Sequence, residues 1–101
     1  KPGNDPIFLV THVDIVPKMK DAGVDLTKGL AATGRKSPQN VRFEALTQNS
    51  RPNHMTVVEI WADRKSLEAH SVAEHMKSYR EKLLPMSGSL YDERHYRAIK
   101  N

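Results

Sequence analysis

The chain has 101 residues, of which 38% are apolar and 28% are charged, and its net charge is +4 at neutral pH. This length predicts a single domain over residues 1–101, and a sequence without cysteine excludes disulfides, thiolate catalysis and zinc sites built on sulfur. The 16 lysines and arginines are spread without a block of five like charges, so they indicate solvated surfaces; a nucleic-acid-binding face is the alternative.

The hydropathy of the chain predicts no contact with a membrane. No apolar run approaches the ~20 residues that cross a bilayer as a helix. We expect a cytoplasmic protein. The alternative is a periplasmic or secreted protein whose leader has been removed, because the sequence starts at Lys1.

The first 40 residues predict a loose tail, a central strand and an amphipathic helix. Residues 1–6 form the polar tail, and residues 7–16 form a strand whose faces are both largely apolar, as in a strand covered on both sides. The helix is expected at residues 17–33, with Gly34 just past its end in a left-handed conformation. The apolar stripe of this helix consists of Met19, Ala22, Leu26 and Leu30.

Two alternating segments in the middle of the chain predict a hairpin of two strands. They are residues 41–49 and 54–62, joined by the turn-rich sequence 49–53, so the loop has about five residues. In the first strand Phe43 shares a face with Val41, and in the second Glu59 and Trp61 share a face. A buried strand therefore ends in an acid and an indole.

The helical region after this hairpin begins with Asp63, whose carboxylate is suited to cap the first turn. It carries His70 and His75, which would lie about 140° apart around an unbroken helix. Both imidazoles can face one cavity only if the helix breaks near residues 71–73. Pro85 and Gly88 end the region, and a last strand follows at residues 91–99.

The resulting order of elements, β-α-β-β-α-β, predicts an α+β protein with the ferredoxin-like fold. In this fold a four-stranded antiparallel sheet has both helices on one face. The other face would carry Phe8 and Val10, or the residues opposite to them, and it is too apolar to be left in water. We therefore expect a homodimer in which two such sheets are stacked face to face.

With this order of elements, the chain resembles the antibiotic biosynthesis monooxygenase (ABM) domain and, within it, the small quinol-monooxygenase-like proteins. The resemblance covers residues 7–99 and is carried by the segment 57–79, VVEIWADRKSLEAHSVAEHMKSY, and by the closing strand. Its most specific part is an acid on the third strand, a Trp two residues later, and two histidines five residues apart. These residues are Glu59, Trp61, His70 and His75, and the closing strand contributes Arg94 and Tyr96.

The resemblance implies a dimeric α+β barrel with a pocket in each subunit between the sheet and the second helical region. In members with known activity, oxygen is added to an electron-rich aromatic such as a quinol, without flavin, haem or metal. We therefore expect a homodimer, a small aromatic substrate and dioxygen as partners, no cofactor, and no nucleic acid.

Such an oxygenation needs a base, because a quinol must lose a proton before it passes an electron to dioxygen. The imidazoles of His70 and His75 have a suitable pKa near neutral pH. Glu59 is the third catalytic candidate, because it could fix the tautomer of a histidine or act as the base itself if burial raised its pKa. The candidates for substrate binding are Trp61, Tyr79, His12 and Phe43.

Several alternatives stay open at the level of the sequence. The dimer could bind a small ligand without catalysis, and the ABM family also has haem-degrading and isomerase-like branches. Purely structural roles are open as well, with Glu59 in an ion pair across the sheet, Trp61 in the core, and His12 at the pocket floor or the dimer interface.

A metal site is not expected, because histidines five residues apart do not share a helical face. RNA binding is not expected either, since strand 41–49 lacks the glycine and aromatic motif of RNA-binding sheets.

Overall fold

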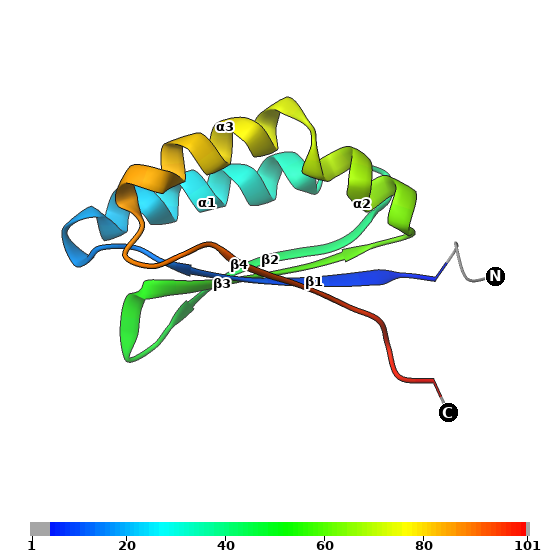
Figure 1. Cartoon of the computed structure of the whole chain (residues 1–101), viewed down its shortest axis with the longest axis horizontal. Helices are drawn as coiled ribbons and strands as arrows, with labels where there is room; N and C mark the ends of the chain where they lie inside the picture. The colour runs from blue at the N-terminus through cyan, green and yellow to red at the C-terminus, as the bar shows by residue number, and fades with distance from the viewer. Residues whose placement is uncertain (1–4, 101) are drawn as a thin grey trace.

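The computed structural model describes residues 5–100, which form a four-stranded antiparallel sheet with the helices on one face (Figure 1). The strand order is β2-β3-β1-β4, so the first strand is central, as predicted. The ferredoxin-like α+β fold expected from the order of elements is confirmed. The elements are β1 (Ile7–Asp14), η2 (Pro17–Met19), α1 (Lys20–Gly34), β2 (Asn40–Gln48), β3 (Arg51–Trp61), α2 (Arg64–Ser71), α3 (Glu74–Leu83), η3 (Leu84–Met86) and β4 (Asp92–Tyr96).

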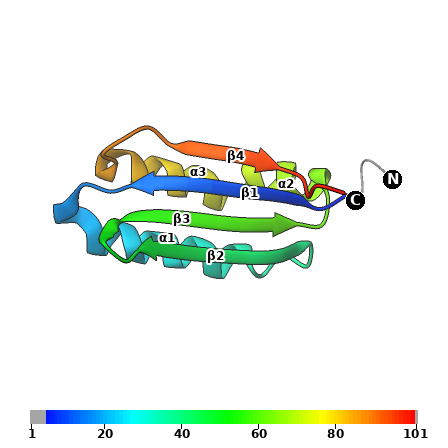
Figure 2. The ribbon, with the colours of Figure 1, turned by 90° about the horizontal axis from the view of Figure 1, so that it is seen from below.

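Side chains alternate between the two faces of the sheet. In β1, and in β3 from Met55 onward, the odd-numbered residues face the helices and are buried, and the even-numbered residues lie on the other face. Figure 2 shows the sheet from this other side, away from the helices. This bare face of the sheet carries the half-buried apolar side chains Phe8, Val10, Val58 and Ile60.

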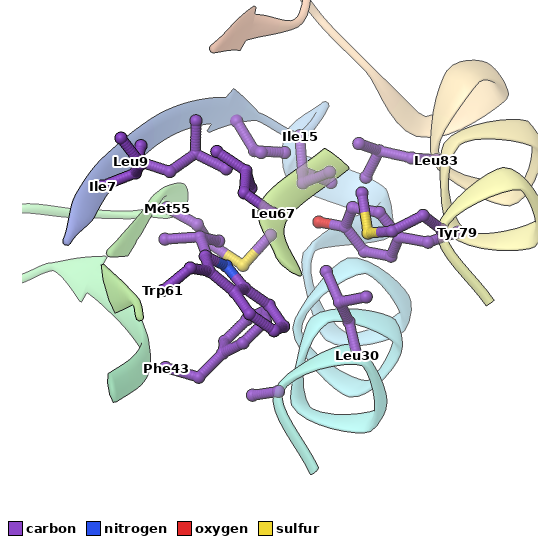
Figure 3. Close-up of a cluster of buried hydrophobic side chains, with 14 residues drawn as sticks. Ile7, Leu9, Ile15, Leu30, Phe43, Met55, Trp61, Leu67, Tyr79 and Leu83 are labelled. Carbon is purple, nitrogen blue, oxygen red and sulfur yellow. The ribbon is translucent and has the colours of Figure 1, made fainter. Parts of the chain in front are cut away.

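The core lies between the sheet and the three α-helices (Figure 3). Its two largest fully buried side chains are Trp61 and Phe43, which are 1% and 2% exposed. Burying an apolar side chain of such size contributes roughly 1.5–3 kcal/mol. The end of β3 is therefore firmly held against the helices. The other buried hydrophobic residues are Ile7, Leu9, Val13, Ile15, Leu30, Ala31, Met55, Val57, Leu67, Met76, Tyr79 and Leu83.

The inward face of α1 differs from the predicted apolar stripe. Ala22 is exposed, whereas Gly23 and Thr27 are buried. Gly34 is the last residue of the helix and has no positive φ, so the predicted left-handed conformation was wrong. Glycine is instead required there for steric reasons, because a Cβ atom at Gly34 would overlap the ring of Phe43. Small residues on α1 thus allow the helix to pack closely on the sheet.

The hairpin between β2 and β3 is tighter than predicted. Gln48 pairs with Arg51, so the turn has two residues, 49–50, rather than about five. Pro52 is tolerated inside β3 because the pairing with β1 ends at His54, which leaves Pro52 without a neighbouring strand on that side.

The second helical region is divided into two helices, α2 and α3. Asp63 caps α2 by accepting a hydrogen bond of 2.8 Å from the backbone N–H of Ser66. Helix α2 ends at Ser71, α3 begins at Glu74, and extended backbone at Ala73 separates the two. The break near residues 71–73, which both imidazoles need in order to face one cavity, is therefore present.

The two ends of the described chain lie close to each other. Residues 1–4 of the predicted tail lie outside the described residues, and Asp5 pairs with Lys100 at 3.0 Å. The last strand, β4, is shorter than the predicted strand 91–99. Within residues 5–100, no helix has the length and hydropathy needed to cross a membrane.

Candidate active site

An acid and an indole meet at the buried end of β3. Glu59 and Trp61 are two residues apart on one strand, so both side chains face the helices, and they are 3% and 1% exposed. The indole Nε1–H donates a hydrogen bond of 2.9 Å to Oε1 of Glu59. No lysine or arginine of residues 5–100 forms an ion pair with this carboxyl group.

The imidazole of His70, near the end of α2, packs against two aromatic rings. Its centroid lies 4.5 Å from that of Trp61, and 5.9 Å from that of Phe43, which it meets edge-on. The Nε2 atom of His70 lies 3.4 Å from Oε1 of Glu59 without meeting the geometry of a hydrogen bond. Within the described part of the chain, this buried nitrogen therefore has a carboxyl neighbour but no hydrogen-bond partner.

His75 lies on the first turn of α3 and faces back toward α2. Its Nε2 atom is 3.1 Å from Nδ1 of His70, so one imidazole donates a hydrogen bond and the other accepts it. His75 is half-exposed, whereas His70 and Glu59 are buried. The three groups thus form a chain that leads from the surface into the core.

Burial shifts the two innermost groups of this chain in opposite directions. It raises the pKa of Glu59 from 4.5 to about 7, although the hydrogen bond from Trp61 acts the other way. Burial also lowers the pKa of His70 from 6.5 to about 4. At neutral pH His70 is therefore uncharged, while Glu59 is close to the midpoint of its titration.

Two hollows share His75 and lie between α1 and the helices α2 and α3. The first, here called the Trp61 hollow, has a volume of about 300 Å³ and is bordered by Trp61, Ala69, His70, His75 and polar residues of the segment 33–39. The second, here called the Tyr79 hollow, has a volume of about 330 Å³ and includes Asp25, Gly29, Ser78 and Tyr79. No aspartate, glutamate, lysine or arginine borders the Trp61 hollow.

Most of the residues that the sequence singled out come together here. The cluster contains Glu59, Trp61, His70, His75 and Phe43. Tyr79 lies one turn beyond His75, but its hydroxyl group lies 3.0 Å from Oγ1 of Thr27 and borders the other hollow. In the described structure the Tyr79 hydroxyl is therefore engaged with α1.

His12 lies on the bare face of the sheet, away from this cluster. Its Nδ1 atom is 3.1 Å from Oγ1 of Thr56. It borders a hollow of about 810 Å³, together with His54, which is 3.4 Å from a carboxylate oxygen of Asp14. The sheet separates His12 from Glu59, so the structure does not bring His12 to the other candidates.

The contribution of α1 to this region was missed at the level of the sequence. The hydroxyl of Thr27 donates to the carbonyl of Gly23 at 2.9 Å and meets Tyr79, and Gly34 borders the Trp61 hollow. The signal that was available is the run of small residues at positions 23, 27 and 34, which marks a face for close packing. Among residues 5–100, no three potential metal ligands are grouped so that they could hold an ion.

A family model described as antibiotic biosynthesis monooxygenase matches residues 6–82 of this chain. The chain belongs to the antibiotic biosynthesis monooxygenase family. This membership confirms the resemblance noted from the sequence, and the matched region contains the whole Glu59–Trp61–His70–His75 motif. Membership of the family supports monooxygenase chemistry, but it does not identify the substrate.

Solved structures share the fold of this ABM protein over nearly its whole length. A protein named antibiotic biosynthesis monooxygenase is 19% identical, with a TM-score of 0.87 and coverage of 93% of this chain and 99% of the other. A conserved protein from Methanosarcina mazei Go1 is 21% identical, with a TM-score of 0.86 and coverage of 95% of each chain. A Pseudomonas aeruginosa protein is 15% identical, with a TM-score of 0.87 and coverage of 97% and 98%. At these identities the likeness shows the fold alone, and no curated protein sequence matches this ABM chain.

Proposed function

We propose that this ABM protein is a cofactor-independent monooxygenase that oxidises a quinol or a related phenolic aromatic with dioxygen. Family membership supports the monooxygenase chemistry. For a quinol, one oxygen atom enters the ring and the other leaves as water, so the product is a hydroxyquinone. The quinol supplies all the electrons that dioxygen accepts, and no external reductant is needed.

The observation that carries this proposal is the chain of Glu59, His70 and His75. A half-exposed imidazole that is hydrogen-bonded to a buried imidazole is suited to take a proton from a substrate. His75 is the proposed base, because it is the more exposed of the two histidines and borders both hollows. Removing the phenolic proton makes the ring electron-rich enough to reduce dioxygen.

The proposed substrate site is the Trp61 hollow. Its border combines the indole of Trp61 with two imidazoles and carries no carboxylate, ammonium or guanidinium group, which suits a neutral planar aromatic. Its volume of about 300 Å³ is at the lower end of the range for ligand sites, roughly 300–1,000 Å³. We therefore expect a substrate with one ring or two fused rings.

We also propose that a second copy of this chain covers the bare face of the sheet. In the register of the strands, Phe8 is opposite Ile60 and Val10 is opposite Val58, so four apolar side chains lie next to one another. Leu46 and Tyr96, which are 50% and 46% exposed, extend this area on the outer strands. An apolar area of this kind is rarely left in water, and two flat sheets can bury it by stacking.

The proposed activity is tested with purified, metal-free protein and a reduced naphthoquinone. We expect oxygen uptake above the spontaneous oxidation of the quinol, and a product that contains one atom from labelled dioxygen. The His75→Ala variant should lose most of this activity. The control is Ser78→Ala, on the same helix, because Ser78 borders only the Tyr79 hollow.

Two outcomes would replace this function with another. Oxygen uptake no faster than in protein-free solution, across a panel of quinols and phenols, would rule out the oxidation. If an aromatic compound then still raised the melting temperature of the protein, the chain would be a non-catalytic binding protein. A new absorbance band after addition of haem would instead indicate the haem-degrading branch of the family.

A further inference from the structure

We propose that Glu59 stores the proton that the substrate loses, and that His70 carries it there from His75. This inference rests on the proposed oxidation for the source of the proton. Its first test needs no substrate, so the two proposals can fail separately.

The geometry of the three groups is that of a relay. His75 Nε2 is 3.1 Å from His70 Nδ1, and His70 Nε2 is 3.4 Å from Oε1 of Glu59. One ring nitrogen of His70 is therefore next to His75 and the other is next to Glu59. The Nε2 atom is buried and has no hydrogen-bond partner in the described structure, so it is free to exchange a proton with the carboxyl group after a small movement.

With Glu59 ionised, the hydrogen atoms of the two imidazoles have one arrangement that favours every contact. His70 then carries its hydrogen on Nε2, toward the carboxylate, and its Nδ1 accepts a hydrogen bond from Nε2–H of His75. This arrangement leaves Nδ1 of His75 without a proton. The exposed histidine is thus prepared to act as a base.

Transfer of one proton along the relay moves the hydrogen atom of each imidazole to its other ring nitrogen. Nδ1 of His75 takes the phenolic proton, the Nε2 proton of His75 moves to Nδ1 of His70, and the Nε2 proton of His70 moves to Glu59. One O–H bond of the substrate breaks and one O–H bond of the carboxyl group forms. Both imidazoles are neutral before and after the transfer, and no oxidant or reductant is consumed.

The surroundings of Glu59 fit a proton store better than a purely structural carboxylate. Its hydrogen bond from Trp61 could be accepted equally well by a glutamine, which would avoid the unfavourable burial of an ionisable group. Burial raises the pKa of Glu59 to about 7, where both ionisation states are accessible in the cell. The other titratable groups that interact electrostatically with Glu59 or His70 are Tyr79, Arg80, Tyr91 and Glu93.

The relay requires a neutral His70, and burial of the ring favours this state. Burial holds the pKa of His70 at about 4, so the ring passes a proton between its nitrogens without remaining charged near pH 7. The guanidinium group of Arg80, whose Nη2 donates to the carbonyl of Ser71 at 3.0 Å, also lowers the pKa of His70. The positive charge of Arg80 therefore disfavours protonation of His70 to the charged imidazolium form.

The first test uses the indole N–H of Trp61, which is the only tryptophan of the sequence and donates to Glu59. In NMR spectra this one resonance should shift between about pH 5 and pH 9, with a midpoint near 7. The shift should disappear in the Glu59→Gln variant. A resonance of the wild-type protein that stays constant over this range would overturn the proposal without the need for any variant.

The second test applies once quinol oxidation is measurable. Glu59→Gln, at a residue that does not border the Trp61 hollow, should lower kcat roughly 100-fold with little change in KM. His70→Phe should lower kcat to a similar extent, and the double variant should have a kcat no lower than either single one. The rise of kcat with pH near 7 should also be lost, because no carboxylate is left to receive the proton. Wild-type kcat in Glu59→Gln would overturn the relay while leaving His75 as the base. If the wild-type protein oxidises no quinol, the proposed function fails and the indole titration alone decides whether Glu59 exchanges a proton.

Discussion

The imidazoles of His70 and His75 meet across the break between α2 and α3, with Nε2 of His75 3.1 Å from Nδ1 of His70. On a continuous helix, residues five apart would point about 140° away from each other. The extended backbone at Ala73 removes this separation and turns the start of α3 toward the end of α2. The break in the second helical region is therefore part of the site.

The buried acid predicts how stability changes with pH in the Glu59→Gln variant. The folded protein raises the pKa of Glu59 from 4.5 to about 7, so between these values the folded state holds a proton that the unfolded state has lost. Stability from this group is present below pH 4.5 and is lost as pH rises to about 7. The free energy of unfolding of Glu59→Gln, relative to wild type, should thus rise by about 3 kcal/mol over this interval. Urea unfolding at a series of pH values measures it, and parallel curves for the two proteins would contradict the shift.

The His70→Phe variant should show the opposite dependence on pH. Burial lowers the pKa of His70 from 6.5 to about 4, so the stability from neutral His70 is present above pH 6.5 and is lost as pH falls to about 4. A phenylalanine keeps a planar ring against Trp61 and does not titrate. Relative to wild type, its free energy of unfolding should rise by about 3 kcal/mol on acidification. If the free energy of unfolding relative to wild type rose with increasing pH in both variants, the predicted protonation states of Glu59 and His70 would be wrong.

Two glycines of α1 should respond oppositely to the same substitution. A Cβ atom at Gly34 would overlap the ring of Phe43, so Gly34→Ala should destabilise the protein by about 1–3 kcal/mol. A Cβ atom at Gly29 meets nothing within 4 Å, so Gly29→Ala should stabilise the helix by about 0.5–1 kcal/mol. Thermal unfolding of the two variants measures the difference. Equal effects would mean that α1 does not pack on the sheet as described.

The features that could be predicted from the sequence are those that leave a periodic or capping signal. Alternation in the two central strands places Glu59 and Trp61 on the buried face, and the carboxylate of Asp63 marks the start of α2. The spacing of the two histidines shows where the helix has to break if both are to face one cavity, and the break lies there. These signals depend on neighbours in the sequence, so they survive without knowledge of the tertiary structure.

The features that were not predicted depend on distances between elements. Gly23, Thr27 and Gly34 add little to a hydrophobic pattern, yet they form the inward face of α1 because only small side chains fit there. The place of His12 on the bare face is set by the strand register, and that register cannot be distinguished from its alternative when both faces of a strand are apolar.

The bare face of the sheet predicts the effect of a charge at its centre. Val58 is half-buried and lies opposite Val10, so Val58→Lys should prevent two sheets from stacking. We expect the wild-type protein to sediment as a dimer and this variant as a folded monomer. The control is Leu84→Lys, at a residue of η3 that is 75% exposed and lies outside the sheet, which should remain dimeric. A monomeric wild-type protein would contradict the stacked arrangement.

The two hollows can be told apart by filling each of them. Ala69 borders only the Trp61 hollow and Ser78 borders only the Tyr79 hollow, so Ala69→Leu and Ser78→Leu each block one. If the quinol binds beside Trp61, Ala69→Leu should raise KM at least about tenfold, which corresponds to about 1.4 kcal/mol of binding free energy. Ser78→Leu should leave KM within about twofold of wild type, because Ser78 does not border the Trp61 hollow. Steady-state oxygen uptake measures both constants, and circular dichroism confirms that both variants are folded. A raised KM in Ser78→Leu alone would move the substrate to the Tyr79 hollow and make the Tyr79 hydroxyl its neighbour.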